Sequence, residues 1–403
     1  MQKPTTTPPP KTTSLPDFSN TEFAFAHLSD AELRRTGWLF RLMNKAWLVK
    51  YSSPVALWAV ENRLPLADWA VKKTIFPQFC GGATLLETQK RIEKLASNNV
   101  MTVLDFGAEA KETEADFNAT MNENLRAIDF AARESETVPI VVSKITGIAR
   151  FGLLEKIQAA ESLTREDLSE YRNVLKRIDA ICHSADKNGV AIYFDAEESW
   201  IQDTIDHLAW LMMRRYNKNR VVVFNTYQMY RHDRLQFLFD SFDRAKKEGF
   251  KLGIKLVRGA YMLKEAKFAE ENGRPTPIQP SKAATDDAYN TAVRFCVENC
   301  DHLEVCNASH NAQSALLQAQ LMDEKGIRRD DPRFMCSQLL GMSDNLTFNL
   351  ARAGFRVAKY VVYGQVKEVI PYLLRRAQEN TSVTGDAGRE LQLILTELER
   401  RKL

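Results

Sequence analysis

From about residue 98 onward, short apolar runs alternate with longer segments whose apolar residues recur at helical spacing. The short runs are rich in β-branched residues and end at polar joints, as buried parallel strands do. The eight runs are Val100–Phe106, Val138–Ile145, Val190–Phe194, Val221–Phe224, Leu252–Val257, Leu303–Cys306, Phe334–Cys336 and Phe355–Val362. The alternation predicts a series of parallel strand–helix units.

The segments between the runs are long enough to return the chain to the start of the next parallel strand. The predicted helices include Ala115–Ser135, Thr164–Lys187, Ile201–Asn217 and Asn311–Lys325. Eight such repeats predict an α/β fold, a closed (β/α)8 TIM-like barrel. An open doubly wound sheet is the competing architecture. Its GxGxxG fingerprint is missing, because the nearest glycine pair, Gly81 and Gly82, precedes the first run.

The rest of the chain predicts an appendage to the barrel rather than a second domain. Residues 1–20, rich in Thr and Pro, are expected to form a disordered tail. Residues 21–97 are expected to form helices packed on the barrel, and residues 98–403 the catalytic barrel, which ends in a helix over Gly388–Leu403. The apolar segment Trp38–Val60 contains Arg41, Lys45 and Lys50, so we do not expect it to span a membrane.

Composition narrows the function classes. Of 403 residues, 44% are hydrophobic and 27% charged, as in soluble globular proteins with a sizeable core. The net charge of +3 is too small to indicate a nucleic-acid-binding protein. Six cysteines without a CxxC pair and six histidines without HxH or HExxH predict no catalytic metal and a reducing compartment. Without an arginine-rich leader, a bacterial cytoplasm is expected, and a mitochondrial matrix is the alternative.

Polar residues at the carboxyl end of each run are the candidate site, because barrel enzymes react at that end of the strands. These residues are Lys144, Asp195, Glu197, Asn225, Thr226, Gln228, Lys255, Arg258, Tyr261, Ser309, His310, Asn311 and Tyr360. Lys255 alternates with Ile254 and Leu256 and is therefore expected to be buried beside an acidic partner. A purely structural pair with Asp195 is equally consistent with this pattern.

A helix over Pro371–Asn380, just after the last run, carries two adjacent arginines, Arg375 and Arg376. Two neighbouring guanidinium groups can clamp a carboxylate in a bidentate manner that lysine cannot match. Glu379 follows Arg375 by four residues, so an ordinary exposed ion pair is the alternative interpretation.

Five motifs occur together, namely FDAE (Phe194–Glu197), KLVRGAY (Lys255–Tyr261), ASHN (Ala308–Asn311), LLGM (Leu339–Met342) and YLLRRAQEN (Tyr372–Asn380). Across about residues 98–382 the chain resembles the monofunctional, flavin-dependent proline dehydrogenase family and the corresponding domain of bacterial proline utilisation proteins. The resemblance implies an FAD-dependent oxidation of L-proline to Δ1-pyrroline-5-carboxylate, the first step of proline catabolism to glutamate. It also implies that the electrons pass to a quinone.

The resemblance further implies roles for individual residues. Asp195 and Lys255 would lie at the reacting centre. The residues implied to bind proline are Lys144, Leu339, Tyr360, Tyr372, Arg375, Arg376 and Glu379. The residues implied to bind FAD are Asp195, Ala196, Gln228, Lys255, Val257, Arg258, Gly259, Ala260, Tyr261, Ser309, His310, Asn311 and Glu379.

Several alternatives remain open at this point. Related enzymes that act on 4-hydroxyproline tend to have a smaller residue where this chain has Tyr360, so tyrosine favours proline. Lys255 stands where many bacterial members have arginine. A Schiff-base aldolase using Lys144 or Lys255 is a rival enzyme class, and a binding scaffold is the non-catalytic alternative. The tryptophan-bearing helices over Trp38–Trp69 suggest peripheral membrane association, although ordinary packing gives the same pattern.

Overall fold

The computed structural model describes residues 14–45, 47, 51, 58–60, 62, 64–381 and 386–403. The start of the predicted tail and much of Trp38–Val60 lie outside these residues. The chain divides into two compact units. Unit 1 comprises residues 1–107 and 338–403, and unit 2 comprises residues 108–337.

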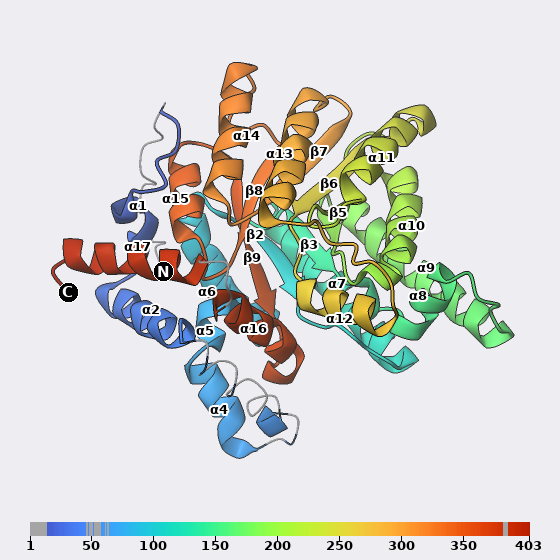
Figure 1. Cartoon of the computed structure of the whole chain (residues 1–403), viewed down its shortest axis with the longest axis horizontal. Coiled ribbons are helices and arrows are strands. Elements are labelled where there is room, and N and C mark those ends of the chain that lie inside the picture. Colours follow the sequence, from blue (N-terminus) through green and yellow to red (C-terminus); the bar gives the residue numbers. More distant parts are fainter. Residues whose placement is uncertain are drawn as a thin grey trace. The chain divides into compact units, whose positions relative to one another are not determined.

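Within the described residues, nine strands form the sheet (Figure 1). They are β1 (Cys80–Gly82), β2 (Met101–Phe106), β3 (Ile140–Ser143), β4 (Ala191–Phe194), β5 (Val223–Gln228), β6 (Leu252–Val257), β7 (Leu303–Ala308), β8 (Phe334–Leu339) and β9 (Val357–Tyr363). The strand order is β1-β9-β2-β3-β4-β5-β6-β7-β8, and β9 also pairs with β8. This order confirms the predicted (β/α)8 barrel. β1 was not predicted, because a three-residue CGG strand has no alternation to detect.

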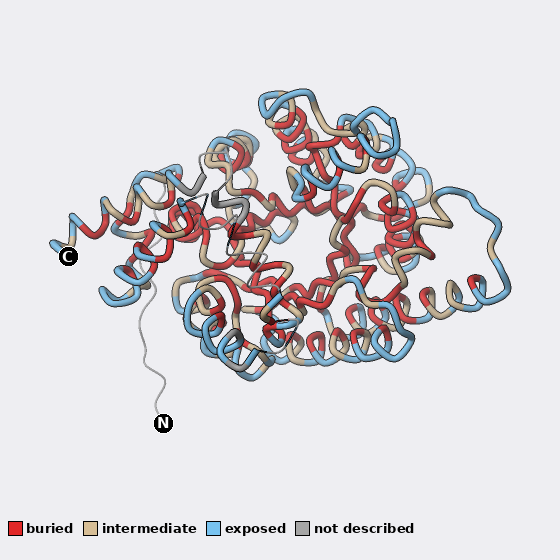
Figure 2. The backbone as a smooth tube through the Cα atoms, turned by 60° about the horizontal axis from the view of Figure 1, so that its bottom comes forward, coloured by how far each residue is buried: buried red, intermediate tan, exposed pale blue. Residues whose placement is uncertain are grey.

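Unit 2 contains β3 to β7 and most of β8, all joined in parallel. The strands are almost entirely buried, whereas the helices bury one face and expose the other (Figure 2). Its helices are α7 (Glu114–Arg133), the 3₁₀ turn η1 (Ile145–Gly147), α8 (Phe151–Gln158), α9 (Arg165–Lys187), α10 (Ser199–Tyr216), α11 (Arg234–Glu248), α12 (Met262–Glu271), α13 (Lys282–Glu298) and α14 (Ala312–Glu324). The four helices predicted here are confirmed to within two residues at each end.

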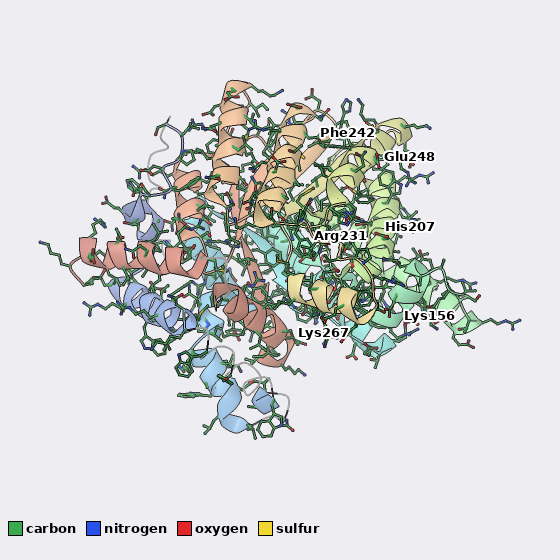
Figure 3. The ribbon with its side chains drawn as sticks, in the orientation of Figure 1. Lys156, His207, Arg231, Phe242, Glu248 and Lys267 are labelled. Carbon is green, nitrogen blue, oxygen red and sulfur yellow. The ribbon has the colours of Figure 1, made fainter. Side chains whose placement is uncertain are left out.

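Side-chain caps explain where several of these helices begin. Thr164 accepts a hydrogen bond from the backbone N–H of Asp167, whose carboxylate accepts one from the N–H of Thr164, which forms a capping box. Ser281 and Asn311 cap α13 and α14 through single hydrogen bonds. The outer faces carry charged side chains such as Glu248 at the end of α11, which accepts a 2.8 Å hydrogen bond from Arg244 (Figure 3).

Unit 1 contains β1, β9 and β2, which pair in parallel in that order. Its helices are α1 (Thr21–Phe25), α2 (Asp30–Met43), α4 (Pro65–Lys73), α5 (Phe76–Phe79), α6 (Leu85–Ala96), α15 (Asp344–Arg352), α16 (Val366–Thr381) and α17 (Asp386–Arg400). The predicted helix over Pro371–Asn380 begins five residues earlier, at Val366, and contains Pro371. The proline therefore does not mark the start of the helix, as its sequence position had suggested.

The amino-terminal residues of unit 1 are fixed to its carboxyl-terminal helices. The side chains of Asn345 and Asn349 donate 3.0 Å hydrogen bonds to the carbonyls of Phe18 and Asn20. Arg401 donates to the carbonyls of two residues near the end of α1. Among the described residues, none of the helices combines the length and the apolar character that crossing a membrane requires.

Candidate active site

Two lysines and one aspartate from unit 2 form a charged cluster at strand ends. The Lys255 ammonium contacts one carboxylate oxygen of Asp195, and the Lys144 ammonium lies 3.6 Å from the other. The lysine side chains are 7% and 9% exposed, and that of Asp195 is 15% exposed. The Lys255 ammonium also lies 5.7 Å from the ring centroid of Tyr193, within cation–π range.

The register of the strands brings these residues together. Ser143 and Phe194 are paired at the ends of β3 and β4, so the next residue of each strand, Lys144 and Asp195, leaves the sheet at the same edge. The Asp195 N–H donates to the carbonyl of Ser143, 3.3 Å away. Lys255 lies in the middle of β6 and is 5% exposed, which agrees with the burial expected from alternation.

Two ammonium groups share one carboxylate in this cluster. Its burial strengthens these interactions relative to water. An arrangement of this kind can attract an anionic group or stabilise negative charge that develops during a reaction.

The residues after β4 and β5 form a second, hydrogen-bonded group. Gln228, at the end of β5, donates a 2.9 Å hydrogen bond to the carbonyl of Glu197. No described residue donates to the side-chain oxygen of Gln228, although it is buried. The Glu197 carboxylate accepts hydrogen bonds from the N–H and hydroxyl of Thr146, at 3.1 and 2.5 Å.

The segment that follows β6 is held by Arg258. Its guanidinium donates to Asp286 at 2.7 Å, to the Ser309 hydroxyl at 2.7 Å and to the Ser314 hydroxyl at 3.0 Å. Gly259 has φ +145°, and a Cβ atom there would come within 2.4 Å of the Tyr230 ring, so only glycine fits. Val257 is partly exposed, Gly259 and Ala260 are exposed, and Tyr261 is buried.

The remaining predicted residues of unit 2 lie at the start of α14 and after β4. Ser309 is buried, and its hydroxyl accepts from the N–H of Asn311 at 3.0 Å. His310 and Ala196 are partly exposed. The structure thus brings the unit 2 candidates to the ends of β3 to β7.

The candidates of unit 1 come from β8, β9 and α16. Tyr360, Tyr372 and Arg376 are buried, and Arg375 and Leu339 are partly exposed. The Arg376 guanidinium carbon lies 5.3 Å from the centroid of the Tyr372 ring. Glu379 belongs to α16, but its side chain is outside the described part of the structure, so the Arg375–Glu379 pair stays a prediction.

Sequence reasoning missed the residues that orient Arg258. Besides Asp286, Tyr289 of the same helix lies under the guanidinium, 4.3 Å from ring centroid to carbon, and Asn290 accepts from the Ser314 hydroxyl at 2.7 Å. These three residues of α13 follow the spacing i, i+3, i+4, which places them on one helix face. An aspartate and an asparagine that share one helix face with a tyrosine are the signal that could have revealed them.

A sequence model of the family described as Proline dehydrogenase matches residues 88–389. The chain belongs to the proline dehydrogenase family. It is 31% identical over 374 residues to "Proline dehydrogenase 1, mitochondrial" of Dictyostelium discoideum, covering 82% of this chain and 65% of that protein. It is 32% identical over 323 residues to "Carbapenem antibiotics biosynthesis protein CarD" of Pectobacterium carotovorum subsp. carotovorum, covering 80% and 83% of the two chains.

The fold resembles that of proline utilization A (PutA) from Bdellovibrio bacteriovorus inactivated by N-propargylglycine. The TM-score is 0.77 at 19% identity, over 91% of this chain and 41% of that one. The chain thus spans less than two thirds of the Dictyostelium relative and of this PutA chain. Membership of the proline dehydrogenase family confirms the predicted resemblance and implies a flavin cofactor.

Proposed function

We propose that this protein is an FAD-dependent proline dehydrogenase that oxidises L-proline to Δ1-pyrroline-5-carboxylate. The observation that carries the proposal is the buried cluster in which Lys144 and Lys255 share Asp195. A barrel of this family with two buried lysines that share one aspartate at the carboxyl ends of its strands suits the oxidation of a substrate that carries a carboxylate.

The residues of unit 2 fit a flavin. The buried Gln228 side-chain oxygen accepts no hydrogen bond from the described residues, and an N–H group of a bound ring would satisfy it. The exposed backbone of Gly259 and Ala260 lies next to the fixed Arg258 guanidinium, which suits a phosphate-bearing cofactor. We assign FAD to Asp195, Ala196, Gln228, Lys255, Ser309, His310, Asn311 and the segment from Val257 to Tyr261, with Glu379 bordering it.

The bound flavin supplies the acceptor for the hydride that leaves C5 of proline. Arg375 and Arg376 hold the proline carboxylate, and Lys144 adds a third positive charge. Glu379 orients the arginines, while Leu339, Tyr360 and Tyr372 surround the ring. Nearby cations favour the neutral amine. Its nitrogen lone pair would form the C=N bond as the hydride leaves C5, and the remaining N–H proton would pass to water. Fixing the carboxylate orients C5, and such positioning is worth up to roughly 7 to 11 kcal/mol in favourable cases.

An absorbance spectrum tests this proposal. We expect the purified protein to show an oxidised flavin spectrum that bleaches when L-proline is added without oxygen. N-propargylglycine, which inactivates the PutA of Bdellovibrio bacteriovorus, should inactivate this protein too. Bleaching by 4-hydroxyproline and not by L-proline would identify 4-hydroxyproline as the substrate. If the protein is colourless and binds no FAD, and if borohydride traps it on a carbonyl substrate, the Schiff-base aldolase replaces this proposal.

We further propose that a quinone accepts the electrons and that unit 1 provides a membrane-facing surface. Three large side chains of α2 and α4 are mostly exposed, namely Trp38, Leu66 and Trp69, at 51%, 77% and 61%. The exposed Lys72 and Lys73 accompany them on α4. Aromatic and apolar side chains beside lysines suit the surface of an anionic bilayer. This surface would lie on the cytoplasmic side of a bacterial membrane or, in mitochondria, on the matrix side.

Vesicle flotation tests the membrane surface separately from the chemistry. We expect the double variant L66S/W69S to bind anionic vesicles at least ~10-fold more weakly than the parent, while its reduction of soluble quinones is unchanged. The exposed Lys267 of α12 offers a matched control, K267Q (Figure 3). Equal binding by the parent and L66S/W69S would remove the proposed surface and leave the proposed reaction intact.

A further inference from the structure

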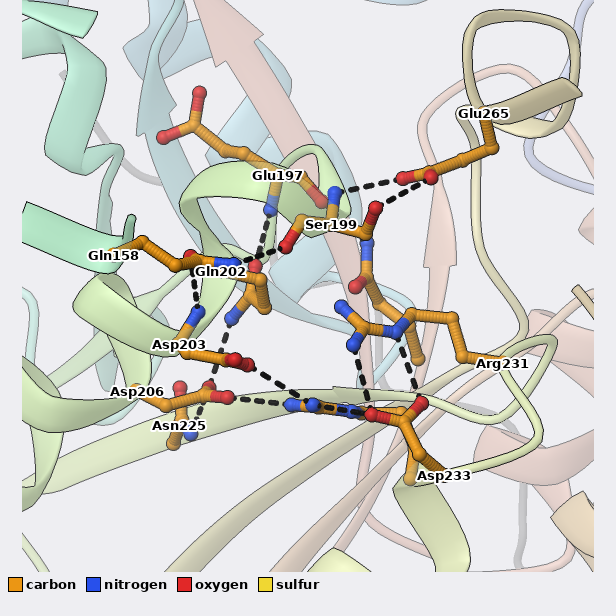
Figure 4. Close-up of polar contacts among 12 residues, drawn as sticks. Gln158, Glu197, Ser199, Gln202, Asp203, Asp206, Asn225, Arg231, Asp233 and Glu265 are labelled. Atoms are coloured by element: carbon orange, nitrogen blue, oxygen red, sulfur yellow. Dashed lines mark hydrogen bonds and ion pairs between the residues drawn. The ribbon is translucent and has the colours of Figure 1, made fainter. Parts of the chain in front are cut away.

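Glu197 belongs to a hydrogen-bonded network of unit 2, and Figure 4 shows the bond between its backbone N–H and Gln202. Glu197 is 4% exposed and follows Asp195 by two positions. Its carboxylate accepts from Thr146, its carbonyl accepts from Gln228, and its N–H donates a 2.7 Å hydrogen bond to Gln202. One residue thus links the turn after β3, the helix after β4 and the last residue of β5.

The contact with Thr146 fixes the turn that begins at Lys144. The N–H of Gly147 donates to the Lys144 carbonyl at 3.1 Å, which closes the turn around Thr146. A Cβ atom at Gly147 would come within 2.9 Å of the Ala108 carbonyl oxygen, so the turn also packs closely on the preceding loop. Because Thr146 is bonded to Glu197 through both its N–H and its hydroxyl, the turn has little freedom to rotate.

The carbonyl of Glu197 fixes the amide of Gln228. The Gln228 nitrogen donates to this carbonyl at 2.9 Å, which determines that the nitrogen, and not the oxygen, of the amide faces Glu197. The side-chain oxygen is therefore left to accept from another group, and no described residue fills that role. Gln202, which holds the Glu197 N–H, is itself held by Asp206 at 2.8 Å.

We propose that Glu197 is a positioning residue that sets both the Lys144 turn and the Gln228 amide for binding of proline and flavin. This inference rests on the proposed function. Burial raises the pKa of Glu197 to about 7, and the hydrogen bonds from Thr146 act in the opposite direction. A carboxyl group that is costly to bury is consistent with a requirement for its specific hydrogen bonds.

The isosteric variant E197Q tests the proposal, with E198Q as its matched control. Glu198 is the adjacent glutamate and is 6% exposed, but its carboxylate pairs with Lys264 at 2.6 Å instead of with Thr146. We expect E197Q to raise KM for proline ~10-fold while kcat changes less than ~3-fold, since a hydrogen bond to a charged group is lost. E198Q should leave both constants unchanged.

Two measurements on the holoenzyme do not depend on turnover. The first is the dissociation constant of an unreactive proline analogue with oxygen in place of the ring nitrogen, followed through the flavin spectrum; it should rise ~10-fold in E197Q. The second is the spectrum of the bound flavin and its retention during gel filtration, both of which should change in E197Q and not in E198Q. If proline does not bleach the flavin spectrum of the wild-type protein, the proposed function is refuted. The flavin spectrum and the retention of flavin in E197Q and E198Q would still decide the role of Glu197.

A pair of threonine variants keeps the proposal open to refutation if E197Q folds poorly. T146V removes the hydroxyl donor and preserves the shape of the side chain, whereas T146S retains the hydroxyl. We expect T146V to shift the analogue dissociation constant in the same direction as E197Q and T146S to restore it. Wild-type behaviour of both E197Q and T146V, or an equal effect of E198Q, would overturn the proposal.

Discussion

Two buried strand lysines in different regions of the molecule invite comparison, Lys255 on β6 and Lys359 on β9. Both alternate with apolar residues, both lie at 5% exposure or less, and both pair with an aspartate. The Lys359 ammonium contacts Asp344 at 2.7 Å and the carbonyls of Met342 and Leu339 at 2.5 and 3.4 Å. All three N–H groups of that ammonium therefore have protein acceptors.

The two clusters differ in the number of lysines that contact the aspartate. Asp344 contacts one lysine, Lys359, and His27 lies 3.4 Å away as a second partner. Asp195 instead contacts two lysines. An ammonium group whose three N–H groups all have protein acceptors holds a fold together, whereas two ammonium groups that share one carboxylate at strand ends can also attract an anion. The same sequence pattern therefore serves both purposes, and the partners decide between them.

The largest predicted effect follows from replacing Asp195 by asparagine. D195N removes the carboxylate charge that two buried ammonium groups share at the proposed reacting centre. We expect kcat/KM for proline to fall at least ~100-fold, which corresponds to about 2.7 kcal/mol at about 1.36 kcal/mol per factor of ten. Steady-state assays with a soluble quinone measure this loss. Near-normal activity of D195N would show that the pair is only structural.

D344N is the matched change in the other cluster. It leaves the Lys359 ammonium buried without its carboxylate, which we expect to lower the free energy of unfolding by about 3 to 5 kcal/mol. The kcat/KM of the folded enzyme should remain within ~3-fold of wild type, because no proposed substrate or flavin contact is removed. Urea unfolding with assays on the same samples separates the two effects. A large loss of kcat/KM at full stability would contradict the comparison.

The pH dependence of stability should have opposite signs at two buried carboxyl groups. Burial raises the pKa of Glu197 to about 7 from 4.5, so its contribution is fully present below pH 4.5 and is lost as the pH rises through 7. We expect E197Q to gain roughly 3 kcal/mol over wild type between pH 5 and 8, at about 1.4 kcal/mol per pKa unit. Urea unfolding across this range measures the gain. A constant difference between the variants would contradict the prediction.

Asp344 provides the opposite sign. Burial acts to raise its pKa, but the Lys359 ammonium and His27 outweigh burial and hold the pKa well below its usual range. Its contribution to stability is present above about pH 3.9 and is lost as the pH falls further. The stability deficit of D344N should therefore shrink only below about pH 4, where the difference in stability between E197Q and wild type no longer changes with pH.

The fold was predictable because its evidence is local and repeated. β6 matches its predicted bounds, and the four helices predicted in unit 2 differ from prediction by at most two residues at each end. Apolar runs and caps mark these elements in the sequence. β1 escaped prediction because three residues carry no periodicity. The start of α16 escaped because Pro371 suggested a first-turn position, whereas the helix accommodates the proline after one full turn.

The site was predictable only as a set of strand ends. Motifs placed Lys144, Asp195 and Lys255 at the edge where parallel strands finish, and the structure brings them into contact. The role of Glu197 was hidden, because its partner Thr146 is 51 residues away in the sequence. Lys359 was not anticipated as a buried charge either, since its backbone acceptors appear only when β9 and the residues after β8 are folded.

Substitution by arginine should also have different effects at Lys255 and at Lys359. K255R keeps the charge beside a carboxylate that is 15% exposed, and we expect less than ~10-fold loss of kcat/KM. K359R must place a larger planar group where the lysine is 1% exposed, which should cost about 1 to 3 kcal/mol of stability. Thermal unfolding and steady-state assays of both variants test this difference. Equal destabilisation by the two substitutions would contradict it.

The smallest predicted effects concern Arg258, a third cation that the protein itself satisfies. Asp286 accepts from both Arg258 and the exposed Lys282, at 2.7 and 3.0 Å. D286N should weaken the retention of FAD during gel filtration by ~3-fold to ~10-fold, because Arg258 loses its charged partner and is less firmly held. K282Q removes only an exposed i,i+4 pair and should change stability by less than about 0.5 kcal/mol and leave retention unchanged. If K282Q released FAD as readily as D286N, the exposed Lys282 contact would matter as much as the Arg258 contact. The hydrogen bond between Asp286 and Arg258 would then not be what retains FAD.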